Sequence, residues 1–464
     1  MSKMMKRIWI LLFVNCCLSM CLLAQEESAN NSRITKSDTL RRLSVRDCVE
    51  LALSNNASLK NARLEVGKAQ ATKKAAFAEY LPSLSVQVLG FEAKDPLVQF
   101  GVSDIDNAML RQVLQTLISE YGYFWGYQDK VSMLENGTLT HATVLQPVYA
   151  GGRIRNGNKL AQLGVEAARL QQDIVENEVV QQTECIYWQI VSLQEKKETL
   201  FVLSTLLDTL HKDVKSAVDA GLIMPNDLLK VTMKKNECEL NLKKVNDGIT
   251  LLMMALGQYT GVDWRNMKMT DTLGGESEPE SFFCEAQQAV ARRSETQLLD
   301  LAVEAESLQK KMTLGAVLPS LAIGGTCMHH TLFNKNSSNM IAFAVLQVPI
   351  TDWYKTGINM KKHELEKEIA LNNRRDLTQK MELQTNQAWF ALQQSWQQIA
   401  LARSNVEQAE ANLKITKDYY EAGLSTLSEL LEAQTLLKST RDEYVDDCIA
   451  YKINLLKYRQ LCGL

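Results

Sequence analysis

The sequence predicts a mainly α-helical fold with a few β-strands, in which one unit of roughly two hundred residues is used twice. Two Ala-Gly-Leu turns, at Gly221 and Gly423, lie 202 positions apart, and each joins two long heptad-patterned segments. Pro147 and Pro349, which each close an apolar run, are separated by the same 202 positions. A Leu-Pro-Ser-Leu sequence at 81–84 returns 237 positions later. We therefore treat the chain as two related halves.

The halves divide the chain into five predicted parts. Residues 1–24 form a signal peptide, 25–42 a polar N-terminal arm, 43–256 the first repeat, 257–281 a connector and 282–461 the second repeat. The connector is recognised by its glycines, its proline and its mixed charge. With only seven prolines and 22 glycines in 464 residues, the composition favours long uninterrupted helices.

The first 24 residues have the layout of a secretory signal, with basic residues, then the apolar run 8–23, then Ala24. We expect cleavage after Ala24. A lipoprotein with Cys21 as the modified residue is an alternative, which the large Met20 before that cysteine disfavours. The formal charge of −3 and the absence of a basic block interleaved with aromatic residues argue against a nucleic-acid partner.

Cysteine and histidine usage argues against a disulfide framework, a metal site or a cofactor. Seven cysteines remain after the signal peptide, none in a Cys-x-x-Cys pair, so we expect single buried thiols. Of the five histidines only His329 and His330 are adjacent, and neighbours on a strand point to opposite faces. No nucleophile elbow, phosphate loop or dinucleotide motif is present, so we expect no enzyme activity.

Strand-like stretches occur at mirrored places in the two halves. Residues 83–89 alternate polar and apolar side chains, and a strand that spans a bilayer needs only about 9 to 11 residues. Residues 137–149 are also rich in β-formers. In the second half, 321–333 and 338–350 predict a hairpin around 334–337. The insertion 90–136, rich in aromatic residues and with a helical pattern at 107–119, has no counterpart of its length there.

Long helices are predicted between the strands and the glycine turns. Helices over 153–219 and 355–422 keep a three-four spacing of apolar residues, a period typical of a helix packed along its length on neighbours. Return helices over 228–257 and 428–460 share that pattern. Shorter helices are expected over 43–80, capped by Ser44, and over 282–317. The two short helices of each half together match the long one in length, which predicts two antiparallel rods.

The glycine turns carry the most informative polar residues. Thr426 and Glu429 form a predicted capping box, and Glu429 and Glu432 share one face of the first helical turn, where the helix dipole favours carboxylates. That local role would explain both without any function. Asp227 occupies the place of Glu429 in the first half, and Lys230 that of Glu432, so the two tips differ in charge.

On these residues the chain resembles the TolC-like outer-membrane efflux protein family. The features that carry the resemblance are the two repeats, the strand pairs, the long helices and the Ala-Gly-Leu tips followed by Asp/Glu-Leu-Leu. The resemblance implies a mainly α fold with a membrane β-barrel. It implies a homotrimer with a shared 12-stranded barrel, a helical tube of antiparallel coiled coils extending into the periplasm, and an equatorial belt built from the connector and chain ends.

The resemblance also implies an exit duct of a tripartite efflux pump in the cell outer membrane, passive and gated at its periplasmic tips. Partners would be outer-membrane lipid, a periplasmic adaptor and an inner-membrane pump. Where relatives often carry arginine two residues after the second tip glycine, this chain has Ser425. The implied aperture residues are Tyr420, Asp227, Glu429 and Glu432, and the implied adaptor contacts are Gly221, Leu222, Gly423 and Leu424.

Other interpretations remain open at this point. A duct for type I protein secretion would use the same fold. A secreted coiled-coil structural protein or adhesin would show the same heptads, but it would need no alternating strands at mirrored places.

Overall fold

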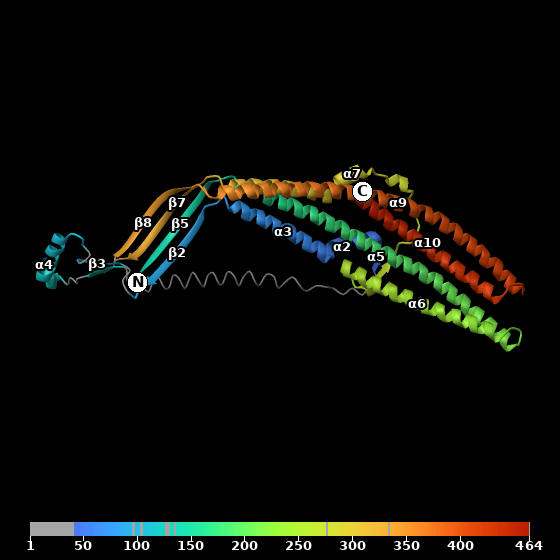
Figure 1. The fold of residues 1–464 in the computed structure, drawn as a ribbon. Coiled ribbons are helices and arrows are strands. Elements are labelled where there is room, and N and C mark those ends of the chain that lie inside the picture. Colours follow the sequence, from blue (N-terminus) through green and yellow to red (C-terminus); the bar gives the residue numbers. More distant parts are fainter. Residues whose placement is uncertain are drawn as a thin grey trace.

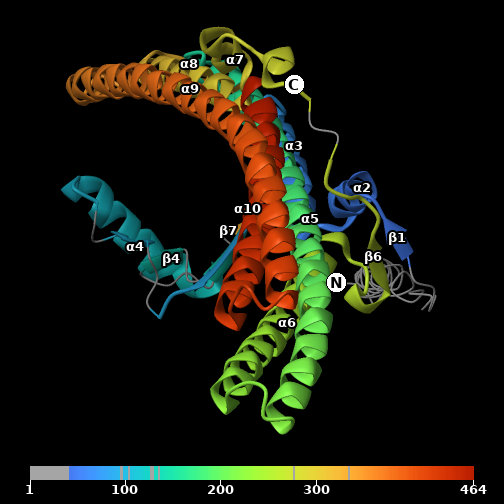
Figure 2. The ribbon, with the colours of Figure 1, turned by 90° about the vertical axis from the view of Figure 1, so that its right-hand side faces the viewer.

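The chain is elongated, with its strands at one end and its helices extending to the other (Figure 1). The computed structural model describes residues 41–94, 98–102, 105–125, 130–133, 136–274, 277–332 and 335–463. The predicted signal peptide and residues 25–40 of the predicted arm lie outside the described residues. Seen along its length from the tips, the helical part forms an arc that is concave on one side (Figure 2).

The first repeat runs from the middle of the molecule to the strands, then along a long helix to the tip and back (Figure 1). The elements of the first repeat are β1 (Arg41–Leu43), α2 (Val45–Asn55), α3 (Ala57–Ala78), β2 (Ser83–Glu92), β5 (Asn136–Ala150), α5 (Arg153–Asp219) and α6 (Pro225–Thr260). Helix α5 has the predicted bounds.

The second repeat follows the same course. Helices α3 and α8 (Ser294–Gly315) both have 22 residues and begin 237 positions apart. Helices α6 and α10 (Leu427–Cys462) both have 36 residues and begin 202 positions apart. These are the two intervals found in the sequence, so the predicted duplication is confirmed. The elements are α7 (Ala286–Arg292), α8 (Ser294–Gly315), β7 (Ser320–Leu332), β8 (Lys335–Gln347), α9 (Asp352–Glu421) and α10 (Leu427–Cys462).

The predicted single helices over 43–80 and 282–317 are wrong, because each is broken into two. The first breaks at Asn56, whose side-chain oxygen accepts hydrogen bonds from the amides of Ser58 and Leu59 at 2.8 and 3.3 Å and so starts a new helix. The second breaks at Arg293, 237 positions later, where the backbone is extended. The predicted capping box of Ser44 and Asp47 is present at the start of α2.

The two tips are turns of one geometry. Gly221 and Gly423 both have φ of +73°, a left-handed conformation that favours glycine. The amides of Leu222 and Leu424 each donate to a carbonyl five residues back, of Ala217 at 2.9 Å and Tyr419 at 2.8 Å. Both tips lie at the end of the molecule opposite the strands, as Figure 1 shows.

Four strands form one antiparallel sheet in the order β2-β5-β7-β8. The predicted hairpin of the second half is confirmed, but β8 begins earlier than predicted, because Lys335 to Ser337 already pair with β7. Thr143 and Thr326, opposite each other on β5 and β7, share a hydrogen bond of 2.9 Å. In the described residues β2 and β8 each pair on one side only, so the sheet has two open edges.

One face of this sheet is apolar and exposed. Leu84, Val86 and Val88 alternate along β2 with polar residues and are 70%, 63% and 69% exposed. Met340, on β8 at the opposite edge of the sheet, is 83% exposed. Apolar side chains exposed in this alternating pattern suit a strand with one face toward lipid. Among the described helices, none combines the length and apolar character needed to cross a membrane.

A belt of short elements crosses the middle of the helices. β6 (Met267–Met269) pairs in parallel with β1, so the predicted loose arm is wrong at residues 41 and 42. The Tyr187 hydroxyl donates to the Leu43 carbonyl at 3.1 Å and accepts from the Asp271 amide at 3.2 Å, which ties the belt to α5. The belt also contains the short helices η2 (Trp264–Asn266) and η3 (Pro279–Phe282).

The insertion lies beyond the sheet, at the end far from the tips (Figure 1). It contains β3 (Val98–Gly101), the helix α4 (Ala108–Trp125) and β4 (Lys130–Met133), and β3 pairs with β4. The helical pattern predicted over 107–119 is thus confirmed and extends further.

Cysteines in the described residues form no disulfide. Four are buried, as predicted, while three are half-buried or exposed. Burial raises the pKa of Cys48 to about 12. The buried ones are Cys48, Cys238, Cys448 and Cys462, and the others are Cys185, Cys284 and Cys327.

Candidate functional site at the helical tips

The two tips share one hydrophobic cluster. It combines apolar residues from the last turns of α5 with others from the first turns of α6 and α10, so both hairpins pack into a common core. Tyr420, in the last turn of α9, packs against this cluster. The buried members are Leu200, Leu207, Leu210, Val214, Val231, Cys238, Leu427, Leu430 and Leu431.

Tyr420 faces carboxylates of the first repeat. Burial, and then the nearby carboxylates of Asp227 and Asp213, raise the pKa of Tyr420. The phenol is neutral at neutral pH and can donate a hydrogen bond. The structure thus brings together Tyr420 and Asp227, two residues that the sequence analysis assigned to the aperture.

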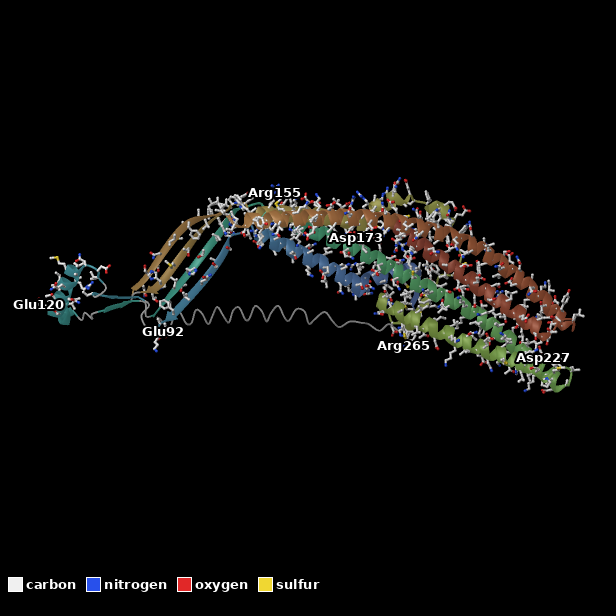
Figure 3. The ribbon with its side chains drawn as sticks, viewed as in Figure 1. Glu92, Glu120, Arg155, Asp173, Asp227 and Arg265 are labelled. Carbon is white, nitrogen blue, oxygen red and sulfur yellow. The ribbon has the colours of Figure 1, made fainter. Side chains whose placement is uncertain are left out.

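Asp227 belongs to a polar chain that joins the tips. Its carboxylate lies 3.2 Å from the ammonium of Lys230, one helical turn further along α6. The same ammonium donates to the hydroxyl of Ser428 on α10 at 3.1 Å. Figure 3 shows Asp227 beside the turn of the first repeat, and Glu92 at the far end of the sheet. The link between α6 and α10 is therefore made by Lys230.

The Lys230–Ser428 bond was not predicted from the sequence. The partners are 198 positions apart. The repeat interval of 202 did contain a signal, since it places Lys230 at the position of Glu432 and shows the two tips to be unequal in charge. That inequality did not identify Ser428 as the partner.

Glu429 forms the predicted capping box. Its carboxylate accepts from the amide of Thr426 at 2.8 Å and from the hydroxyl of Ser425, and its own amide donates to the Thr426 hydroxyl at 3.3 Å. These hydrogen bonds, that from Ser425 first, lower the pKa of Glu429. Ser425, the departure from the family pattern, thus acts within its own helix start.

Glu432 lies one turn further along α10 and is exposed. It lines a groove of about 840 Å³ between α6 and α10, with Lys230, Met233 and Ser428 among the other lining residues. The two predicted aperture carboxylates therefore differ, because Glu429 is bonded to its helix start and Glu432 borders open space.

The predicted adaptor-contact residues lie in the two tip turns. Leu222 and Leu424 are each 77% exposed. A side chain added at Gly221 or Gly423 would meet no other atom within 4 Å. Both tips therefore present an apolar side chain on an open turn, with the same geometry in each half.

The adjacent histidines on β7 do not converge. His329 is exposed and its Nδ1 lies 2.9 Å from the Ser338 hydroxyl on β8, while His330 is half-buried. Their alternating burial agrees with the prediction that they point to opposite faces of the sheet.

Residues 285–464 match the family described as outer membrane efflux protein, a stretch that covers the second repeat from α7 onward. No curated protein matches the chain in sequence.

Solved structures share the fold over most of the chain. The outer membrane protein VceC of Vibrio cholerae is 14% identical, with a TM-score of 0.72 over 90% of this chain and 96% of that one. The CmeC outer membrane channel of Campylobacter jejuni is 15% identical, with a TM-score of 0.74 over 93% and 90%. The MtrE outer membrane channel of Neisseria gonorrhoeae, solved in its open state, is 13% identical, with a TM-score of 0.67 over 94% of both chains.

These matches are to channel and outer-membrane proteins and not to enzymes. They confirm the predicted resemblance to the TolC-like efflux proteins. The second repeat matches the outer membrane efflux protein family, and over most of its length the chain has the fold of the outer membrane channels.

Proposed function

We propose that the chain is the outer-membrane exit duct of a tripartite efflux pump, through which small molecules pass passively from the periplasm to the exterior. The observation that carries this proposal is the sheet with two open edges at one end of a curved helical protomer (Figures 1 and 2). An open edge in a membrane must be paired, because lipid offers no hydrogen bonds to the backbone. Three copies, each with four strands, would close a 12-stranded barrel.

In this proposal the sheet lies in the outer membrane and the helices extend into the periplasm. The apolar face formed by Leu84, Val86, Val88 and Met340 faces lipid. The match of the second repeat to an efflux protein family favours export of small molecules over type I protein secretion. Transport itself would need no catalysis, since an inner-membrane pump supplies the energy through an adaptor.

The tips would form the gate. Three copies of the shared hydrophobic cluster and of the Lys230–Ser428 bond would hold the tube narrow at its periplasmic end. Three copies of Glu429 and Glu432 would place six carboxylates around the opening and so favour cations. Opening would separate α10 from α6, and Tyr420 would move away from Asp227.

Leu222 and Leu424 would be the contacts for a periplasmic adaptor. Their exposure, 77% each, leaves apolar surface on both tip turns. The variant Leu222→Ser/Leu424→Ser should reduce capture of the adaptor by the purified duct. Leu251→Ser, which changes a leucine that is 67% exposed on α6 but lies away from the tip, should not reduce it. Equal capture by the tip variant would refute the contact.

Deletion of the gene in its host tests the function. We expect a small cationic dye to accumulate in the deleted cells, and expression of the full chain to restore its export. Normal dye export together with loss of a secreted protein would instead indicate a secretion duct.

A further inference from the structure

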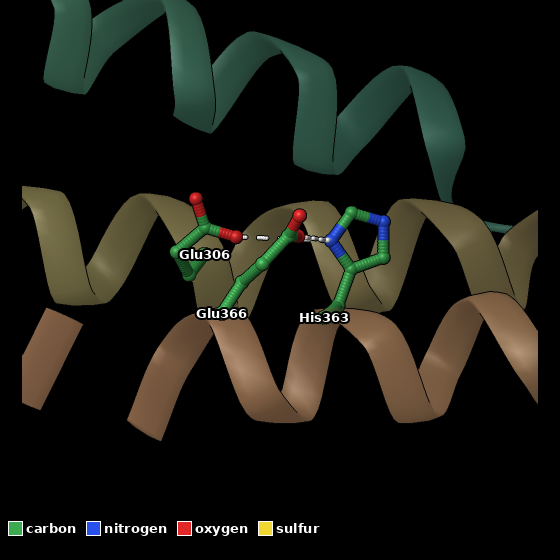
Figure 4. Close-up of side chains that lie close together, drawn as sticks. All are labelled: Glu306, His363 and Glu366. Atoms are coloured by element: carbon green, nitrogen blue, oxygen red, sulfur yellow. Dashed lines mark ion pairs between the residues drawn. The ribbon is translucent and has the colours of Figure 1, made fainter. Parts of the chain in front are cut away.

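Three possible metal ligands converge between two helices of the second repeat. Glu306 comes from α8, and His363 and Glu366 come from one turn of α9 (Figure 4). The Nδ1 atom of His363 lies 2.9 Å from Oε2 of Glu366 and 3.7 Å from Oε2 of Glu306. One ligand atom from each of the three residues lies within 4.8 Å of the ligand atoms of the other two.

Two of these atoms are buried without a hydrogen bond. Oε2 of Glu306 and Nδ1 of His363 are both out of contact with solvent and have no hydrogen-bond partner. A carboxylate oxygen of Glu366 lies at hydrogen-bond distance from Nδ1 of His363, but the angle between the two groups does not suit a hydrogen bond. Buried polar atoms without partners are costly, and a cation between them would satisfy both.

The fold does not require this trio. The repeat intervals place Ala69 of α3 opposite Glu306, and Ala161 and Gly164 of α5 opposite His363 and Glu366. Small residues therefore fill the same place in the first half. The polar trio is a feature of the second half alone, and packing of the helices does not account for it.

The neighbouring lysines do not pair with the three atoms that would bind a metal. Lys362 lies 3.5 Å from Oε1 of Glu366, whereas Oε2 is the oxygen that lies 2.9 Å from His363. Lys310 and Lys361 approach Glu364 at 3.5 and 3.7 Å and not the trio. Lys362 would thus orient the Glu366 carboxylate through Oε1, as groups that contact a metal ligand but not the metal commonly do.

We propose that Glu306, His363 and Glu366 bind one divalent transition-metal ion of the zinc type. One imidazole nitrogen with two carboxylate oxygens is a ligand set that such ions accept. Ligands about 2.1 Å from a tetrahedral ion lie roughly 3.4 Å apart, close to the 2.9 and 3.7 Å separations. The trio is 18% to 35% exposed, which leaves a fourth position for water or another ligand. A bound ion would tie α8 to α9.

This site could not be predicted from the sequence, because Glu306 and His363 are 57 positions apart and only His329 and His330 are adjacent histidines. The proposal revises the expectation that the chain holds no metal. It is independent of the proposed transport function, since its test measures binding alone.

The test is calorimetric titration of Zn²⁺ into the full-length, tag-free protein in detergent, after treatment with a chelator. We expect one Zn²⁺ per chain for the natural protein. Glu306→Ala and His363→Ala introduce the residue found at the equivalent first-half position, and each should lower the affinity by at least about tenfold. His211→Ala, which removes a histidine of α5, is the matched control and should bind as the natural protein does.

Zn²⁺ should also raise the unfolding temperature of the natural protein but not that of His363→Ala. Circular dichroism verifies that each variant is folded, and Glu306→Gln replaces Glu306→Ala if the latter is not. Absence of binding by the natural protein would overturn the site. Unchanged binding by His363→Ala, or an equal loss with His211→Ala, would do the same.

Discussion

The ammonium of Lys230 on α6 donates a hydrogen bond of 3.1 Å to the hydroxyl of Ser428 on α10. This bond joins the second turn of α6 to the first turn of α10, two return helices that belong to different repeats. It lies beside the shared hydrophobic cluster, and Lys230 also neutralises Asp227 at 3.2 Å. In the proposed trimer, separation of the two hairpins would break it.

Lys230→Met should therefore make the proposed gate easier to open. A hydrogen bond of this partly exposed kind contributes about 1 kcal/mol, so the open population should rise about fivefold per protomer. Single-channel recording would measure this as a higher conductance or longer openings. Lys234→Met is the matched control, because Lys234 pairs with Glu237 on its own helix at 3.0 Å. If the double variant Lys230→Met/Ser428→Ala shows the sum of the two single effects on gating, the Lys230–Ser428 bond is not the cause of those effects.

The effect of Glu432 on charge selectivity should be easier to isolate than that of Glu429. The double variant Glu429→Gln/Glu432→Gln should lower cation preference, measured as a reversal potential in a salt gradient. Glu432→Gln alone should give much of that change, because Glu432 is exposed and takes no part in the capping box. Glu443→Gln, further along α10, should leave the potential unchanged. An unaltered potential in the double variant would refute the carboxylate ring.

The start of α10 should weaken in acid. Because the pKa of Glu429 is lowered in the folded tip, its ionised form stabilises the fold, and the contribution is present above its ordinary value of 4.5. It is lost as the pH falls through the lowered folded value. Channel openings should thus become longer below about pH 4.5, and Glu429→Gln should show long openings at neutral pH.

Asp47→Asn provides the control for this effect. Asp47 forms the same capping box with Ser44 at the start of α2, and its pKa is also lowered. It lies far from the tips, so the variant should gate as the natural protein does. Identical gating of Glu429→Gln and the natural protein at neutral pH would contradict the proposed role of the cap.

The junction between strands and helices should tolerate no side chain at Gly315. A Cβ there would overlap the carbonyl oxygen of Gly151, on the turn between β5 and α5. Gly315→Ala should reduce the yield of folded protein and lower its unfolding temperature. Gly164→Ala, in an open position of α5, should stabilise by about 0.5 to 1 kcal/mol. Equal thermal stability of the two variants would show that the junction is looser than described.

The repeat made much of this fold predictable. The bounds of α5, the tight turns at Gly221 and Gly423, and the strand pairs all follow from periodicity and punctuation in the sequence. The breaks at Asn56 and Arg293 did not follow, since neither glycine nor proline marks them. The cap at Asn56 depends on one side-chain oxygen, and Arg293 makes no side-chain cap bond. The parallel pairing of β1 with β6 was equally hidden, because it joins segments more than two hundred positions apart.

At the tips, the capping box of Glu429 could be predicted because it is local in sequence. The bond from Lys230 to Ser428 and the convergence of Glu306 on His363 could not be, because each depends on the side-by-side packing of separate helices. Interactions within one helix start could therefore be predicted from the sequence, whereas interactions between helices could not.

Electron cryomicroscopy of the purified full-length protein in lipid nanodiscs tests the central claim most directly. We predict a threefold particle in which β8 of each protomer pairs with β2 of the next to close 12 strands, and in which all the tips converge at the other end. A particle in which β2 and β8 remain unpaired in lipid, or whose symmetry is not threefold, would contradict the proposed duct.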